Sequence, residues 1–301
     1  MELNINKLSQ TEQEAEIKLT WDELAPYFEE AYKKFQAEAE IKGFRKGKAP
    51  LELIKNPVEL ARWVCDRHFG VGADGIILIE KSETADFKMV YYNSDGSFGG
   101  MCGNGGRCVA KLAYMLGIAK EKMKFEANKK LYFAEIIDDE KVKLYLPNPR
   151  KREFNLKLKL DKKFFKAHFV DSGAPHLVVF TDENGIKNIE KININNLGKK
   201  LRFHPRFKHG TNVNFVSIIA EDTIRMRTYE RGVEGETLAC GTGSVASVIA
   251  SVEKRNIKIP VKVKTSSGEI LTVGWDAQKP KFIYLEGSAK LICQGYLNYD
   301  S

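Results

Sequence analysis

Cys102-Gly103-Asn104-Gly105 and Cys240-Gly241-Thr242-Gly243 are two tetrapeptides of the form Cys-Gly-x-Gly, and they lie 138 residues apart. Each follows a β-rich stretch and precedes an apolar stretch with helical spacing, over Arg107–Leu116 and Ala246–Val252. A repeat of strand, glycine turn and helix predicts a duplicated domain. We therefore expect an α+β fold in which two pseudo-symmetric α/β halves face each other across a cleft.

The segments around the two turns support this organisation. Short apolar runs broken by glycine predict strands at residues 76–79, 87–92, 142–146, 154–160, 177–180 and 215–219. The pair Asn56-Pro57 interrupts a helical stretch over residues 51–68 and marks a seam, because proline is poorly tolerated inside a helix. Three parts follow: residues 1–56, a first half over 57–160, and a second half over 161–301 whose last strand can return to the first.

The repeated turn also predicts chemistry. A helix that begins at such a turn directs unpaired N–H groups and a partial positive charge at the space before it, which suits a carboxylate. The same field is expected to lower the pKa of a cysteine at the helix N-terminus. Cys102 and Cys240 on opposite faces of one ligand could act as base and acid and so invert a stereocentre.

Composition excludes several other classes. The chain has 301 residues, five cysteines and a formal net charge of +8. No apolar run is long enough to span a bilayer, and the N-terminus lacks the features of a secretory signal, so we expect a cytoplasmic protein with no membrane contact. The cysteines have neither zinc-site spacing nor the count of a disulfide framework, and no metal site is expected. The lysines are spread along the chain, which argues against DNA binding.

Longer motifs around both turns carry a resemblance. Asn93-Ser94-Asp95-Gly96-Ser97 with Met101–Cys108, and Tyr229–Gly243, resemble the two signatures of diaminopimelate epimerase, and Phe69–Gly75 and Gly173–His176 also fit. The resemblance covers residues 57–301. It implies an isomerase of lysine biosynthesis that interconverts LL- and meso-2,6-diaminopimelate without pyridoxal phosphate or any other cofactor, and that can form a homodimer.

The resemblance also assigns roles to residues. Cys102 and Cys240 become the catalytic pair. The backbone amides that hold the reacting carboxylate belong to Gly103, Asn104, Gly241 and Thr242. The residues that grip the distal end of the substrate are Asn93, Asn212, Glu230 and Arg231, and His176 is placed near the cysteines in a secondary role.

Two alternatives stay open at this stage. One is another isomerase of the same fold, similar to proline racemase or to a phenazine-biosynthesis enzyme. The other concerns residues 1–56, where Gly43-Phe44-Arg45-Lys46-Gly47-Lys48-Ala49-Pro50 resembles the ribosome-docking signature of the chaperone trigger factor. A strand at 15–19 and a helix at 21–40 precede this basic loop, which implies a ribosome contact. The first 56 residues contain nothing like the glycine-rich opening segment of the epimerase family.

Overall fold

The computed structural model describes residues 2–7, 13–18, 56–161, 163–275 and 282–294. The chain divides into two compact units. The smaller comprises residues 1–76, 92–97 and 293–301, and the larger comprises residues 77–91 and 98–292. Both Cys-Gly-x-Gly turns belong to the larger unit. The predicted helix at 21–40 and the basic loop at 43–50 lie outside the described residues.

The smaller unit contains a hairpin and a helix. Strand β1 (Glu2–Lys7) pairs antiparallel with β2 (Gln13–Lys18), which confirms a strand close to the predicted one at 15–19. Helix α3 (Pro57–Cys65) begins at the predicted seam. The Asn56 side chain caps it by accepting a hydrogen bond from the backbone N–H of Val58, and Pro57 occupies the first turn, where a missing N–H costs nothing.

The larger unit is built on one mixed sheet. Its order is β3-β4-β5-β6-β7-β16-β15-β14-β12-β11-β10-β9-β8, with β13 paired to β12. The strands are β3 (Gly75–Glu80), β4 (Phe87–Asn93), β5 (Lys122–Ala127), β6 (Lys130–Ile136), β7 (Lys141–Pro147), β8 (Lys151–Leu160), β9 (Lys163–Asp171), β10 (Pro175–Phe180), β11 (Asn212–Ala220), β12 (Thr223–Glu230), β13 (Gly235–Thr237), β14 (Val261–Lys264), β15 (Ile270–Trp275) and β16 (Phe282–Ser288). The helices are α4 (Gly103–Met115), α5 (Ile194–Arg202) and α6 (Gly241–Arg255).

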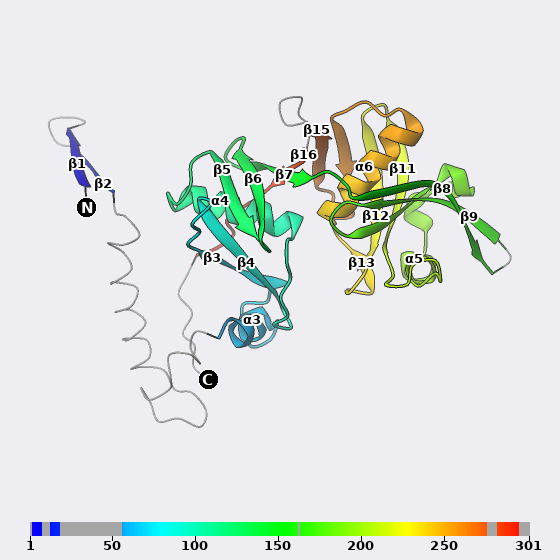
Figure 1. Ribbon diagram of the computed structural model, residues 1–301, viewed down its shortest axis with the longest axis horizontal. Coiled ribbons are helices and arrows are strands. Elements are labelled where there is room, and N and C mark those ends of the chain that lie inside the picture. The colour runs from blue at the N-terminus through cyan, green and yellow to red at the C-terminus, as the bar shows by residue number, and fades with distance from the viewer. Residues whose placement is uncertain (1, 8–12, 19–55, 162, 276–281, 295–301) are drawn as a thin grey trace, which may run out of the picture. The chain divides into compact units, whose positions relative to one another are not determined.

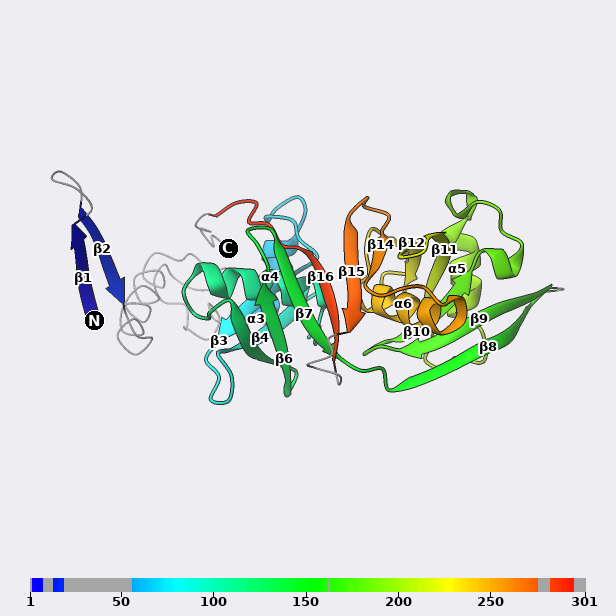
Figure 2. The same ribbon diagram turned by 90° about the horizontal axis from the view of Figure 1, so that it is seen from above.

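The sheet repeats one motif around its centre. Helix α4 connects the parallel strands β4 and β5, and α6 connects the parallel strands β12 and β14. Two antiparallel strands follow each crossover, β6 and β7 after the first, β15 and β16 after the second. The last strand β16 pairs antiparallel with β7, so the two repeats join in the middle of the sheet (Figure 2). The predicted α+β fold with two pseudo-symmetric halves is confirmed, while the three-part division of the chain stays a prediction.

The two crossover helices differ in burial. Most of α6 is enclosed by strands, and its buried residues include Val245, Ala246, Val248 and Ile249 (Figure 1). Helix α4 buries one face through Val109, Ala110 and Ala113 and leaves the other to solvent. Among the described residues no helix is both long enough and apolar enough to cross a membrane. The two repeats therefore present their cysteines in unlike surroundings.

Candidate active site

Cys102 is the residue that precedes helix α4. Its backbone is extended, with φ −108° and ψ 128°, and its sulfur accepts a hydrogen bond from the backbone N–H of Gly105 at 3.5 Å. The side chain therefore caps the helix and lies in the positive end of the helix dipole. The residue as a whole is half-buried.

Cys240 occupies the equivalent position before α6, but it is buried, with 7% of its surface exposed. The Thr242 hydroxyl lies 3.8 Å from its sulfur. Burial, and next the negative charge of Glu230, raise the pKa of the Cys240 thiol to about 12. The expectation that the helix N-terminus lowers the thiol pKa is therefore wrong for Cys240, because loss of water outweighs the helix field. Cys240 rests as a neutral thiol, the form of a general acid.

The two helix N-termini meet. A Cβ atom added to Gly241 would lie 3.4 Å from the Cα of Gly103, and one added to Gly103 would lie 3.5 Å from the Cα of Gly241. The side chain of Leu285, from the shared strand β16, closes the contact at 2.9 Å from the first of these positions. Glycine at both positions allows this approach, which brings the starts of the two helices, where backbone N–H groups lack partners within the helix, close together.

Asn104 adds a polar atom at this junction. Its Oδ1 is buried and accepts no hydrogen bond from any residue that the structure describes. The same oxygen lies 3.8 Å from the position of a Cβ on Gly241, so it faces the start of α6. A buried acceptor without a donor is costly, and a ligand with an N–H group would satisfy it.

His176 lies beneath Cys240 and is completely buried at the start of β10. Its Nε2 is 2.9 Å from the Thr242 hydroxyl, and its Nδ1 is 3.2 Å from the side-chain nitrogen of Asn214. Burial, with a contribution from the charge of Arg231, lowers the pKa of the His176 ring to about 3. The ring is therefore neutral at physiological pH, and a histidine predicted for a secondary role contacts the cysteine turn through Thr242.

The depressed pKa of His176 predicts how stability depends on pH. The unfolded ring binds a proton near pH 6.5, whereas the folded ring binds one near pH 3. The free energy of unfolding should be unaffected by this ring above pH 6.5 and should fall by roughly 3 kcal/mol between pH 6.5 and pH 4. Urea unfolding of the parent and of His176→Gln across this range checks this. The difference between the two proteins isolates His176, since the other buried histidine, His168, is present in both; a constant difference would contradict the prediction.

Asn212 organises the turn that carries Arg231. Its Oδ1 accepts a hydrogen bond from the backbone N–H of Arg231 at 2.8 Å, and its Nδ2 donates to the carbonyl of Pro175 at 3.0 Å. The Arg231 side chain is exposed, and its guanidinium donates to the carbonyl of His209 at 3.5 Å. Glu230 ends β12 on the side of Cys240. The structure thus brings Asn212, Glu230 and Arg231 together with the Cys240 turn.

Two side chains at this site were missed by sequence reasoning. The Arg202 guanidinium, buried on α5, binds the Glu234 carboxylate at 2.9 Å and so anchors the turn after Arg231. Asn214 lies below the first turn of α6, and an added Cβ on Gly243 would be 2.5 Å from its Oδ1. Neither belongs to a recognisable motif, and the first five residues of β11 are all buried, so no alternation along the strand singles out Asn214.

Asn93 belongs to the smaller compact unit. There it closes the turn to Ser97: the Asn93 backbone N–H donates to the Ser97 carbonyl at 2.9 Å, and its Nδ2 donates to the Ser97 hydroxyl at 3.0 Å. A substrate-contacting role for Asn93 stays a prediction.

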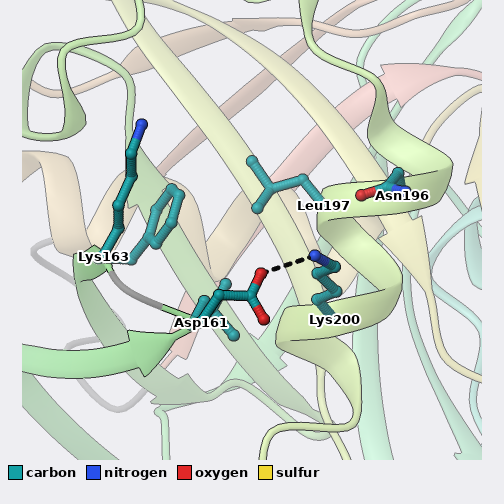
Figure 3. A pocket seen from close by; sticks show the side chains of 7 residues that line it. Asp161, Lys163, Asn196, Leu197 and Lys200 are labelled. Carbon is teal, nitrogen blue, oxygen red and sulfur yellow. Dashed lines mark hydrogen bonds and ion pairs between the residues drawn. The ribbon is translucent and has the colours of Figure 1, made fainter.

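One cavity lies elsewhere in the larger unit. It has a volume of about 450 Å³, and an ion pair between Lys200 and Asp161, 2.9 Å long, crosses its wall (Figure 3). Lys163, the first residue of β9, also lines this cavity. The other end of β9 is followed by Ser172, whose hydroxyl donates to the Thr242 carbonyl in the cysteine turn. Since each strand residue advances about 3.3 Å, the length of β9 separates the cavity from the cysteine turn by roughly 25 Å. The cavity is therefore not part of the cysteine site.

Comparison with known proteins places these features in a family. The model of the family "Diaminopimelate epimerase" matches residues 48–151 and 168–292. The diaminopimelate epimerase of Aquifex aeolicus is 44% identical over 245 residues, which cover 80% of this chain and 85% of that protein. That of Chlorobaculum tepidum is 42% identical over 241 residues, covering 79% and 90% respectively.

Solved structures show the same fold at lower identity. A phenazine biosynthesis protein from Bacillus anthracis aligns with a TM-score of 0.55 and 14% identity over 81% of this chain and 88% of that one. A probable proline racemase from Agrobacterium radiobacter, with bound carbonate, aligns with a TM-score of 0.56 and 21% identity over 77% and 78%. The N-terminal residues 1–62 match a second family model, "Bacterial trigger factor protein (TF)", which overlaps the first over residues 48–62.

Proposed function

Because the chain belongs to the diaminopimelate epimerase family, we propose that it interconverts LL- and meso-2,6-diaminopimelate, with Cys102 and Cys240 as the two acid–base groups. The observation that supports this proposal is the contact at Gly103 and Gly241 between two helix N-termini, each directly preceded by a cysteine. The curated relatives favour diaminopimelate over the substrates of the proline racemase and phenazine enzymes, whose resemblance is to the fold.

In the proposed reaction, Cα of the substrate loses one proton and gains another on its opposite face. The thiolate of one cysteine removes the proton from Cα, and the electron pair is delocalised into the neighbouring carboxylate. The thiol of the other cysteine then gives its proton to the opposite face of Cα, which inverts the centre. The cysteines exchange protonation states in each turnover, and no other reactant is consumed.

The helix N-termini stabilise the charge that develops. The backbone N–H groups of Gly103, Asn104, Gly241 and Thr242 bind the reacting carboxylate, where they are fixed before the reaction begins. Oδ1 of Asn104, which is buried without a hydrogen-bond partner among the described residues, accepts a hydrogen bond from the substrate's ammonium group next to the reacting carboxylate. The distal amino-acid end is held by Glu230 and Arg231 together with Asn212, since a guanidinium matches a carboxylate in charge and shape.

Proton exchange tests this function directly. LL-diaminopimelate incubated with the protein in heavy water should gain deuterium at Cα as the meso form appears, which NMR and mass spectrometry follow. L-proline should show no exchange under the same conditions. Exchange into proline without exchange into diaminopimelate would replace the proposal by the racemase alternative.

The cysteine pair should also make the enzyme sensitive to oxidation. Both thiols are reduced in the structure, and a disulfide between them would remove base and acid together. We expect mild oxidant to lower activity at least tenfold and a thiol reductant to restore it. Peptide mapping should find a bond between Cys102 and Cys240, and Cys108→Ala should respond like the parent. Activity that survives a complete Cys102–Cys240 bond would rule out the two-thiol mechanism.

We also propose that the N-terminal segment retains a ribosome contact through Gly43–Pro50, an assignment supported by the family match over residues 1–62. Co-sedimentation with ribosomes tests it. The double variant Arg45→Ala/Lys46→Ala should sediment less than the parent, and Lys157→Ala/Lys159→Ala, which removes the same charge from exposed positions of β8, should not. Equal sedimentation of both variants would reject this site. A cytoplasmic location and a homodimer stay predictions.

A further inference from the structure

Asn214 is a fully buried polar residue on β11 to which the proposed reaction gives no part. Its Nδ2 donates to the carbonyl of Leu177 at 3.2 Å and also faces Nδ1 of His176 at 3.2 Å. Its Oδ1 accepts from the hydroxyl of Thr228 at 3.0 Å. All three partners lie within the sheet beneath Cys240.

These contacts fix the orientation of the amide. A backbone carbonyl can only accept, so the atom of Asn214 next to the Leu177 carbonyl is the NH2 group. The second hydrogen of the same group is directed at Nδ1 of His176, and this ring nitrogen must therefore be the unprotonated one. Because the ring is neutral, its proton is on Nε2.

The Nε2–H tautomer of His176 determines how the Thr242 hydroxyl is oriented toward Cys240. Nε2–H of His176 donates to the Thr242 oxygen at 2.9 Å. The Thr242 hydroxyl has one hydrogen, and with its oxygen already accepting, that hydrogen is available to the Cys240 sulfur at 3.8 Å. We infer that Asn214 is a positioning residue that holds His176 as its Nε2–H tautomer and thereby turns the Thr242 hydroxyl to donate to Cys240. This inference rests on the proposed acid–base role of Cys240.

The arrangement matters when Cys240 carries a negative charge. A buried thiolate needs donors, and a hydrogen bond to a charged acceptor is about twice as strong as one between neutral groups. With the opposite tautomer, Nε2 would accept from Thr242, and the hydroxyl would point away from the sulfur. His176 does not exchange its proton in this scheme, which suits a ring that is neutral and sealed from water.

Nitrogen NMR of the whole chain tests the tautomer without any substitution. The protein contains five histidines, and loss of one signal in His176→Gln identifies the ring of interest. We expect its Nδ1 to resonate as an unprotonated nitrogen and its Nε2 as a protonated one from pH 5 to pH 8. The reverse pattern, or a doubly protonated ring in this range, would overturn the inference.

A double-mutant cycle tests the effect on Cys240. Asn214→Asp keeps the shape of the side chain, but its carboxylate can only accept, so Nδ1 of His176 must take the proton. We expect kcat to fall at least tenfold. In a Thr242→Val background, which lacks the hydroxyl, the same substitution should change kcat less than threefold, and Thr242→Ser should restore the large effect. An equal loss in both backgrounds would show that Asn214 acts only through the fold.

A control variant and a measurement without substrate separate this inference from the proposed function. Ser251→Ala removes another buried hydroxyl group from α6, far from Cys240, and should leave both the His176 signals and kcat unchanged. The tautomer is measured without substrate. If His176 shows the expected tautomer but diaminopimelate gains no deuterium at Cα, only the proposed function is contradicted. If diaminopimelate gains deuterium at Cα but His176 shows the opposite tautomer, only this inference is contradicted. If Asn214→Asp does not fold, the spectrum of the parent still decides.

Discussion

Replacing either Cys102 or Cys240 by alanine is expected to lower kcat for diaminopimelate epimerisation by about 10²- to 10⁴-fold, the usual contribution of a positioned acid or base. Each substitution removes a proton-transfer group from one face of the substrate, and the other cysteine cannot reach that face. Rates are measured by the appearance of the meso form and by deuterium incorporation at Cα.

The other three cysteines are the matched controls. Cys65→Ala, Cys108→Ala and Cys293→Ala should each keep kcat within about tenfold of the parent, or roughly 1.4 kcal/mol of barrier. Cys108 is the most informative, since it lies on α4 six residues after Cys102, or about 1.7 helical turns, and is exposed. If Cys108→Ala lowered kcat as much as Cys102→Ala does, the effect could not be assigned to a Cys102–Cys240 pair, and the two-cysteine mechanism would be contradicted.

Gly243→Ala is expected to lower kcat about a hundredfold, equivalent to about 2.7 kcal/mol of barrier, and to lower the melting temperature. The added methyl group would lie 2.5 Å from Oδ1 of Asn214 and 3.2 Å from the sulfur of Cys240. Since neither position allows a normal contact, the start of α6 must shift, and overpacking of this kind typically costs 1–3 kcal/mol of stability. Steady-state kinetics and thermal unfolding measure the two effects.

Gly235→Ala is the control for this substitution. Its added Cβ would meet only the side chain of Asn195, at 3.9 Å, although it lies in the same signature segment. Its kcat should stay within about threefold of the parent, well under 1 kcal/mol of barrier. If Gly243→Ala also remains fully active, the contact between Asn214 and the first turn of α6 has no part in catalysis.

The elements nearest the two turns were predictable because their signals are local. Strands β3, β4, β7, β8, β10 and β11 and helices α4 and α6 all appear where apolar spacing predicts them, with longer bounds. Helix α5 was not predicted. Ile194, Leu197 and Leu201 have helical spacing, but the segment is short and contains Asn195, Asn196 and Gly198, which favour turns.

The electrostatics of the site could not be predicted from the same signals. The helix field at Cys240 is a local property and was foreseen, whereas the burial that raises its pKa depends on strands from distant parts of the chain. The same holds for His176, whose surroundings combine β10, β11 and α6. Sequence motifs thus predict the two cysteine turns, whereas the protonation states of Cys240 and His176 depend on tertiary packing.

The central pairing of β7 with β16 has a consequence for synthesis of the chain on the ribosome. Strand β7 ends at Pro147, and the strand that covers its edge begins at Phe282, roughly 135 residues later. At 5–20 residues per second, translation leaves that edge without its partner for about 7 to 27 s. During this interval Leu144 and Leu146, buried in the finished protein, border an unpaired strand edge open to other nascent chains. The edge of β7 can therefore be covered only after residues 282–288 have been made.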